Sequence, residues 1–159
     1  MMLLFLDVDG PLIPFGAVDH AYPVHDGPPV PVVEHPLLTR VDPALGPRLA
    51  ALGCELVWAT TWMDEANAVL APWLGLPALP VVRWPDEDGP PVPPHWKTRP
   101  LVTWAAGRAF VWVDDEIGEA DRAWVAVHHP GPALLHRVDH RYGLTEADFR
   151  VLEKWLAAR

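Results

Sequence analysis

The sequence is short of cysteine and of long apolar runs. Cys54 is the single cysteine among 159 residues, which excludes an internal disulfide and a cysteine-rich zinc site. No stretch approaches the ~18 consecutive apolar residues that a membrane span requires. The apolar run at the N-terminus is short, has no basic flank and ends in aspartate, so we expect no signal peptide. These features predict a cytoplasmic protein without a membrane partner.

Positive charge is also scarce. Lysine and arginine together number 12 against 21 aspartates and glutamates, which gives a net charge of −9 at pH 7. This balance argues against tight, nonspecific binding to nucleic acid, although it is compatible with a local basic groove. Proline is abundant, and most of the 20 prolines fall in two tracts that we interpret as long loops.

The most informative stretch is residues 3–10. Its apolar run is typical of a strand buried on both faces of a parallel sheet, and it ends in Asp7 and Asp9, one residue apart. Ligands of such sheets bind at the carboxyl ends of the strands. Two carboxylates there repel each other and lose hydration, so we expect a cation or a proton beside them.

The rest of the chain alternates between strand-like and helix-like segments. Further strands are predicted at residues 55–59, 79–82, 109–113 and 124–127, and helices at 42–53, 64–74, 99–106, 116–121 and 145–156. This alternation predicts an α/β fold, with a Rossmann-like parallel sheet between two layers of helices. We expect one domain over residues 1–159. Residues 11–41 are predicted to form an irregular hairpin or flap, with a β-like piece at 30–33.

Polar residues stand at strand or loop ends in a fixed order. Each alone has an ordinary explanation, because chains commonly become polar where they leave the core. Their order and chemical identities together indicate a functional site. In chain order they are Asp7 and Asp9, then Thr60, then Lys97, then Asp114 and Asp115.

This arrangement resembles the haloacid dehalogenase (HAD) superfamily, whose four motifs occur in that order. Residues 7–10 look like the first motif, Thr60 the second, Lys97 the third and residues 111–115 the acidic fourth. The spacing between the motifs is too short for a large cap domain. Within the superfamily, the chain is similar to small HAD domains found beside RNA-repair modules. The implied substrate is therefore a nucleic-acid end phosphate or a phosphorylated small molecule.

The resemblance implies a Mg²⁺-dependent phosphomonoester hydrolase that acts through an aspartyl-phosphate. Asp7 is then the nucleophile, and Asp9 protonates the leaving oxygen and later activates water. Mg²⁺ is implied on the Asp7 carboxylate, the Asp9 main-chain carbonyl and the acidic pair. Of that pair, we favour Asp115 as the direct ligand and Asp114 as the residue that orients Asp115 or a metal-bound water.

Further roles follow from the same resemblance. Thr60 would hydrogen-bond a phosphoryl oxygen, and Lys97 would neutralise the phosphate and the nucleophile. Other expected substrate contacts are Val8 and Gly10, through their N–H groups, and Thr61 and Trp62.

Three alternatives stay open on the sequence. A phosphotransferase or phosphomutase shares every catalytic residue. A signalling receiver domain has similar residues, but its acidic pair comes first in the chain. A non-catalytic HAD-like module that binds phosphate is the third alternative.

Other conspicuous residues are interpreted as structural. Trp58 and Trp112 lie within predicted strands and are expected in the core. His128, His129 and His136 are interpreted as solvated loop residues, because no partner has clear metal-ligand spacing.

Overall fold

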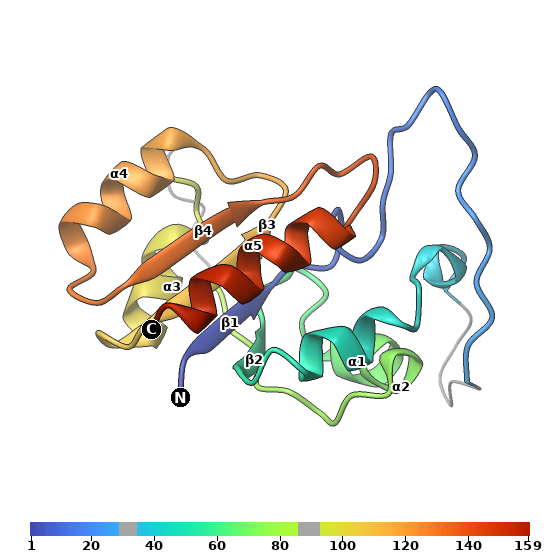
Figure 1. The fold of residues 1–159 in the computed structure, drawn as a ribbon, viewed down its shortest axis with the longest axis horizontal. Helices are drawn as coiled ribbons and strands as arrows, with labels where there is room; N and C mark the ends of the chain where they lie inside the picture. The colour runs from blue at the N-terminus through green and yellow to red at the C-terminus, as the bar shows by residue number, and fades with distance from the viewer. Residues whose placement is uncertain (29–34, 86–92) are drawn as a thin grey trace.

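The computed structural model describes residues 1–28, 35–85 and 93–159 (Figure 1). Within these ranges, four parallel strands form one sheet in the order β2-β1-β3-β4. The strands are β1 (Leu3–Leu6), β2 (Glu55–Trp58), β3 (Phe110–Asp114) and β4 (Ala133–Arg137). The predicted α/β class is confirmed, and the described residues include no large cap. The β-like piece predicted at 30–33 and the acidic residues 86–88 lie outside the described ranges.

Helices cover both faces of the sheet. They are η1 (Leu38–Arg40), α1 (Leu45–Ala50), a π-helical segment η2 (Ala66–Leu70) that continues into α2 (Ala71–Leu74), α3 (Thr98–Ala105), α4 (Glu119–His128) and α5 (Glu146–Ala157). Among the described residues, each helix is too short or too polar to cross a bilayer. The helices predicted at 42–53, 64–74 and 99–106 correspond to α1, η2 with α2, and α3, with small shifts at their ends.

Two apolar clusters lie on opposite faces of the sheet, because successive strand residues point in opposite directions. Leu6 and Trp58 pack with Phe149 in the cluster beneath α1, α2 and α5. Phe5 and Trp112 pack with residues of α3 and α4 in the other cluster. Figure 1 shows the resulting three layers. The prediction that both tryptophans lie in the core is confirmed, since their exposures are 0% and 1%.

The sheet extends beyond β2 by a single parallel bridge between Trp58 and Val81, so the strand predicted at 79–82 is minimal. The Asn67 side chain supports this edge. Its Oδ1 accepts hydrogen bonds from Trp58 Nε1 and Leu79 N, both at 2.8 Å, and its Nδ2 donates to Leu79 O at 2.7 Å. When the Val81 segment is counted as the third strand in chain order, the strands lie in the spatial order 3-2-1-4-5. That is the doubly wound order, whose ligand crevice lies between the first and fourth strands.

Three predictions in the C-terminal half are wrong. Residues 124–127 form no strand but lie in α4, which also replaces the brief helix predicted at 116–121. Helical spacing buries Asp121 and Val125 on one face of α4, and the Asp121 carboxylate caps its first turn. The fourth strand is β4, which the sequence analysis interpreted as a loop. Because β4 pairs only with β3 among the described residues, it keeps the polar residues His136 and Arg137.

His128 is exposed as predicted, although it lies at the end of α4 rather than in a loop, whereas His129 and His136 are less solvated than predicted. His129 is 6% exposed and packs edge-on against Phe110, with ring centroids 4.7 Å apart. His136 lies in β4 and pairs with Asp148 at 2.7 Å. Asp148 also accepts hydrogen bonds from the backbone and hydroxyl of Thr145, which forms a capping box at the start of α5.

Candidate active site

The ends of β1, β2 and β3 meet at one edge of the sheet. Leu6 is paired with Trp58 of β2 and Val113 of β3, so the next residue on each strand emerges at the same level. Asp7 follows β1, and its N–H donates to Val113 O at 3.1 Å. The parallel register therefore brings together residues that lie about a hundred positions apart in the sequence.

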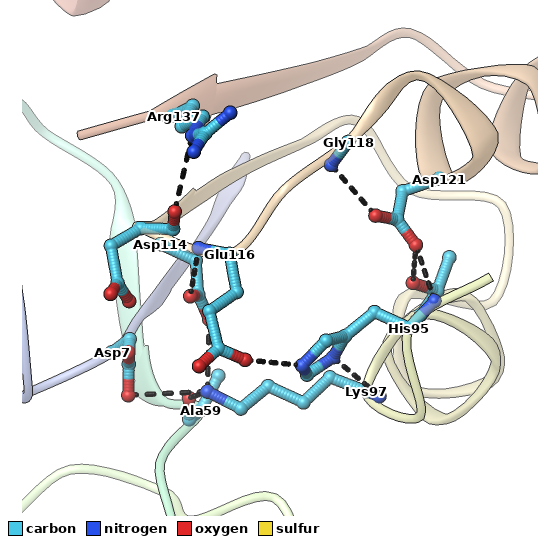
Figure 2. A network of polar contacts seen from close by, with 11 residues as sticks. Asp7, Ala59, His95, Lys97, Asp114, Glu116, Gly118, Asp121 and Arg137 are labelled. Carbon is cyan, nitrogen blue, oxygen red and sulfur yellow. Dashed lines mark hydrogen bonds and ion pairs between the residues drawn. The ribbon is translucent and has the colours of Figure 1, made fainter. Parts of the chain in front are cut away.

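Lys97 brings a buried positive charge to this edge (Figure 2). Its Nζ lies 3.1 Å from Asp7 Oδ1 and 2.9 Å from Asp114 Oδ2, and it donates to Ala59 O at 3.0 Å. The residue is 5% exposed. Burial lowers the pKa of Lys97, but the charges of Asp7 and Asp114 outweigh this effect and hold the pKa above its ordinary value. The ammonium is therefore a fixed positive charge at neutral pH.

Three carboxylates surround this single ammonium. Oxygens of Asp7, Asp114 and Asp115 all lie within 4.8 Å of one another. Burial raises the pKa of Asp7 to about 8 despite Lys97, with the Asp114 charge adding to the shift. Burial and the Asp114 carboxylate raise the pKa of Asp115 to about 6. Negative charge therefore exceeds positive charge here, and a cluster of carboxylate oxygens with excess charge suits a Mg²⁺ ion.

The members of the acidic pair have different surroundings. Asp114 uses both side-chain oxygens within the protein, because Oδ2 pairs with Lys97 and Oδ1 accepts a hydrogen bond from Glu116 N at 3.0 Å. Asp115 faces the loop after β1. Its main-chain carbonyl accepts a hydrogen bond from Arg137 Nε at 3.2 Å, which anchors the residue to β4.

The loop after β1 folds back tightly against Asp115. The Val8 carbonyl accepts hydrogen bonds from the N–H groups of Leu12 and Ile13, both at 3.0 Å. Gly10 has φ of +104°, and a Cβ at this position would lie 2.7 Å from Asp115 Cγ. The Gly10 N–H donates to Ile13 O, so it is engaged within the loop rather than presented to a ligand. Glycine is required here by both backbone conformation and space.

Asp9 lies outside the buried cluster. It is exposed, and its Oδ2 accepts a hydrogen bond from Trp62 Nε1 at 3.3 Å. The backbone N–H of Trp62 donates to Thr60 Oγ1 at 3.2 Å, which joins the fully buried Thr60 to the same group. Because Thr60 Oγ1 accepts this bond, its own hydroxyl proton remains a donor. Thr61 and Trp62 line a cavity beside Asp9.

Tryptophans shield Lys97 from solvent. Its Nζ lies 5.9 Å from the ring centroid of Trp84 and 5.5 Å from that of Trp96, within the range of cation–π attraction. The two rings meet edge-on at 5.0 Å, and Trp84 Nε1 donates to Thr60 O at 3.0 Å. This arrangement strengthens the electrostatic interactions of the ammonium by excluding water.

Sequence reasoning missed Asp121, which holds the turn that carries Lys97. Its Oδ1 accepts hydrogen bonds from His95 N at 2.6 Å and Thr98 Oγ1 at 2.8 Å, and its Oδ2 accepts one from Gly118 N at 2.8 Å (Figure 2). The sequence signal was present, because an aspartate three residues after a glycine suits the start of a helix. The helix predicted at 116–121 ends at Asp121, whereas in the structure this residue lies in the first turn of α4.

The fold and this acidic crevice define a doubly wound α/β domain with a candidate phosphate-handling site. A family model for the HAD domain in Swiss Army Knife RNA repair proteins matches residues 3–149. The chain therefore belongs to this family, and membership indicates phosphoesterase-type chemistry of the kind that typically uses Mg²⁺. No curated protein and no solved structure gives a significant match to the chain.

Proposed function

We propose that the protein hydrolyses phosphomonoesters in a Mg²⁺-dependent reaction that passes through an aspartyl-phosphate on Asp7. The observation that carries the proposal is the buried group in which carboxylates of Asp7, Asp114 and Asp115 lie within 4.8 Å of one another beside Lys97. A nucleophile held beside a fixed ammonium and a divalent-ion site is suited to phosphoryl transfer, where positioning and charge neutralisation dominate catalysis.

The reaction has two steps. In the first, an Asp7 oxygen bonds to phosphorus while the bond between phosphorus and the ester oxygen breaks, and protonated Asp9 gives its proton to that leaving oxygen. In the second, Asp9 takes a proton from water as the water oxygen attacks phosphorus. Phosphate is released, the Asp7 carboxylate is restored and Asp9 is again protonated.

The residues around Asp7 have complementary roles. Asp7 and Asp115 are assigned as carboxylate ligands of Mg²⁺, together with the Asp9 main-chain carbonyl. When bound, the ion neutralises charge on the transferring phosphoryl group. Asp114 orients Lys97, since both of its side-chain oxygens already have partners in the protein. Thr60 donates its hydroxyl proton to a phosphoryl oxygen.

The strand order supports this proposal over a receiver domain. Counting the Val81 bridge as the third strand gives the order 3-2-1-4-5, whereas receivers of the flavodoxin-like class have the order 2-1-3-4-5. Transfer to an acceptor other than water shares the first step. It is distinguished by adding an alcohol acceptor and measuring whether a new phosphoester appears alongside free phosphate.

The test of the proposed function compares substitutions of three aspartates. Asp7→Asn is expected to abolish Mg²⁺-dependent phosphate release from a generic monoester. Asp9→Asn is expected to slow turnover by about 10²–10⁴-fold, the usual contribution of a general acid–base group. Because Asp9 also serves the second step, this variant should accumulate phosphorylated protein, detected by intact mass. Exposed Asp19 provides the matched control, and Asp19→Asn should behave as wild type. Unchanged turnover by Asp7→Asn rules out the mechanism.

Two substrate classes remain candidates, a phosphorylated small molecule and a nucleic-acid end. The family description supports a nucleic-acid end, whereas the net charge of −9 opposes close approach of a polyanion. A panel of metabolite monoesters and of oligonucleotides phosphorylated at the 3′ or 5′ end, each with and without Mg²⁺, separates them by kcat/KM.

A further inference from the structure

The cavity beside Asp9 has no role in the chemistry described so far. Its volume is about 400 Å³, and the lining residues come from the loop after β1, the segment before η1 and the segment after β2. They are Asp9, His35, Leu37, Thr61, Trp62 and Glu65. This size is within the range of small-molecule sites.

The cavity lies next to the proposed general acid, because Asp9 is one of its lining residues. A general acid must lie within hydrogen-bond reach of the oxygen that it protonates. Because Asp9 lines the cavity, an ester oxygen that reaches Asp9 directs its attached group into the same space. Asp9 is also fixed toward this side by the hydrogen bond from Trp62 Nε1 at 3.3 Å.

The walls define the chemistry of that group. The rings of His35 and Trp62 both line the cavity and pack against each other, with 4.5 Å between centroids and 40° between their planes. Aromatic faces of this kind stack on planar rings, including all nucleobases. Asp9 carries a proton when it acts as the acid, so the carboxylate that remains in the lining is that of Glu65, and the described lining residues include no lysine or arginine. Such a lining favours a group rich in hydrogen-bond donors and repels a second phosphate.

We propose that this cavity is the leaving-group subsite and that it selects phosphomonoesters of planar, uncharged ring systems, of which a nucleoside is the natural example. The inference rests on the proposed function because it takes Asp9 as the acid. It goes beyond the proposed function because it limits the negative charge that the leaving group can carry. The nucleoside of a monophosphate brings no further charge into the cavity, whereas a leaving group with additional phosphates, as in a bisphosphate or an oligonucleotide, meets the carboxylate of Glu65.

The kinetic test uses adenosine monophosphates, glycerol phosphate and adenosine 3′,5′-bisphosphate with the full chain and Mg²⁺. We expect kcat/KM for the better of the 3′- and 5′-monophosphates to exceed that for glycerol phosphate by about tenfold or more, a usual stacking contribution. The bisphosphate and a phosphorylated dinucleotide should be poorer substrates than the monophosphate. His35→Ala should reduce the ratio of monophosphate to glycerol phosphate, and His35→Phe should restore it. Glu65→Gln should improve the bisphosphate relative to the monophosphate.

A binding measurement separates this inference from the proposed function. Calorimetric titration with adenosine, which has no phosphate, should show binding that weakens about tenfold in His35→Ala and is retained in His35→Phe. Exposed Trp104 on α3 provides the matched control, and Trp104→Leu should leave both readouts unchanged. Adenosine binding without hydrolysis of any ester would support the subsite and reject the enzyme. Hydrolysis with the same selectivity in wild type and His35→Ala, or a preference for the bisphosphate, would overturn the subsite alone.

Discussion

Gly10 brings the main chain of the first loop against the side chain of Asp115. Its φ of +104° disfavours any other residue, and an added Cβ would lie 2.7 Å from Asp115 Cγ. The two effects are separable because Gly53 has a similar left-handed φ of +74° with nothing within 4 Å of an added Cβ. A comparison of the two glycines therefore isolates the contact with Asp115.

We predict that Gly10→Ala lowers activity by about 10²-fold, because the displaced Asp115 carboxylate no longer has its place in the acidic group. Gly53→Ala should cost only about 1–2 kcal/mol of stability, from backbone strain, and leave kcat/KM intact. Steady-state kinetics and thermal unfolding of both variants provide the measurements. Equal loss of activity in both variants would show that backbone strain, rather than the contact, is responsible.

At this scale, the sequence contained most of the candidate site. Asp7 follows one apolar run and the acidic pair follows another. In each case the run and the acid are adjacent in the sequence, so the pattern could be recognised without the fold. The cavity wall formed by His35 and Trp62 was not predictable in the same way. Those residues are 27 positions apart, and no period or spacing relates them until the chain folds.

At the scale of elements, α4 and α5 begin alike. Asp121 and Asp148 each occupy the third helical position and each accept a hydrogen bond from the backbone N–H three residues earlier. Only Asp121 also binds the turn that carries Lys97, through His95 N and Thr98 Oγ1. Substitutions of Asp121 and Asp148 can therefore be compared to distinguish loss of stability at a helix start from loss of the position of the Lys97 ammonium.

We predict that Asp121→Ala and Asp148→Ala each reduce the free energy of unfolding by at least about 1–2 kcal/mol, the usual cost of a lost cap, because each aspartate also has partners outside its helix start. Only Asp121→Ala should also lower kcat, by about tenfold or more and with little change in KM, since Lys97 loses its alignment. Asp121→Asn retains one acceptor oxygen and should recover part of the activity. The idea fails if the two alanine variants lose activity equally.

The same elements show where sequence reasoning was weakest. β1 and the first four residues of β3 form continuous apolar runs, which is why these strands, buried on both faces, were predicted. β4 lies at the edge of the sheet, and its polar His136 finds a partner in Asp148, so its composition resembles a loop. Residues 124–127 have strand-like side chains, yet the capped start of α4 and the burial of Val125 at helical spacing outweigh that local preference.

Across the whole molecule, the excess negative charge of the acidic group links stability to pH. The pKa of Asp7 rises from 3.8 to about 8, so between these values the folded protein retains a proton that the unfolded chain releases. The free energy of unfolding therefore decreases as pH rises through this window, by at most about 1.4 kcal/mol per pH unit from this group. The raised pKa of Asp115, about 6, acts in the same direction.

We predict that Asp7→Asn stabilises the metal-free protein, with a difference from wild type in Tm that grows from pH 5 to pH 8. Mg²⁺ should raise the Tm of wild type, and more at pH 8 than at pH 5, because the ion competes with protons for the same carboxylates. The Asp7→Asn variant should show a smaller response. Melting curves with Mg²⁺ or with a chelator test this, and a Tm unaffected by Mg²⁺ at every pH would contradict it.

The amide of Asn67 has a consequence for how copies of this protein meet. The Asn67 side chain hydrogen-bonds to both the N–H and the C=O of Leu79. These are backbone groups that a further strand would otherwise use to pair with this segment. Because these backbone groups of Leu79 are already paired with a side chain, a strand from a second copy cannot hydrogen-bond to them. This edge of the sheet therefore disfavours self-association. Asn67→Leu should therefore form aggregates faster on mild heating, as followed by light scattering, even where phosphate release at low temperature is preserved.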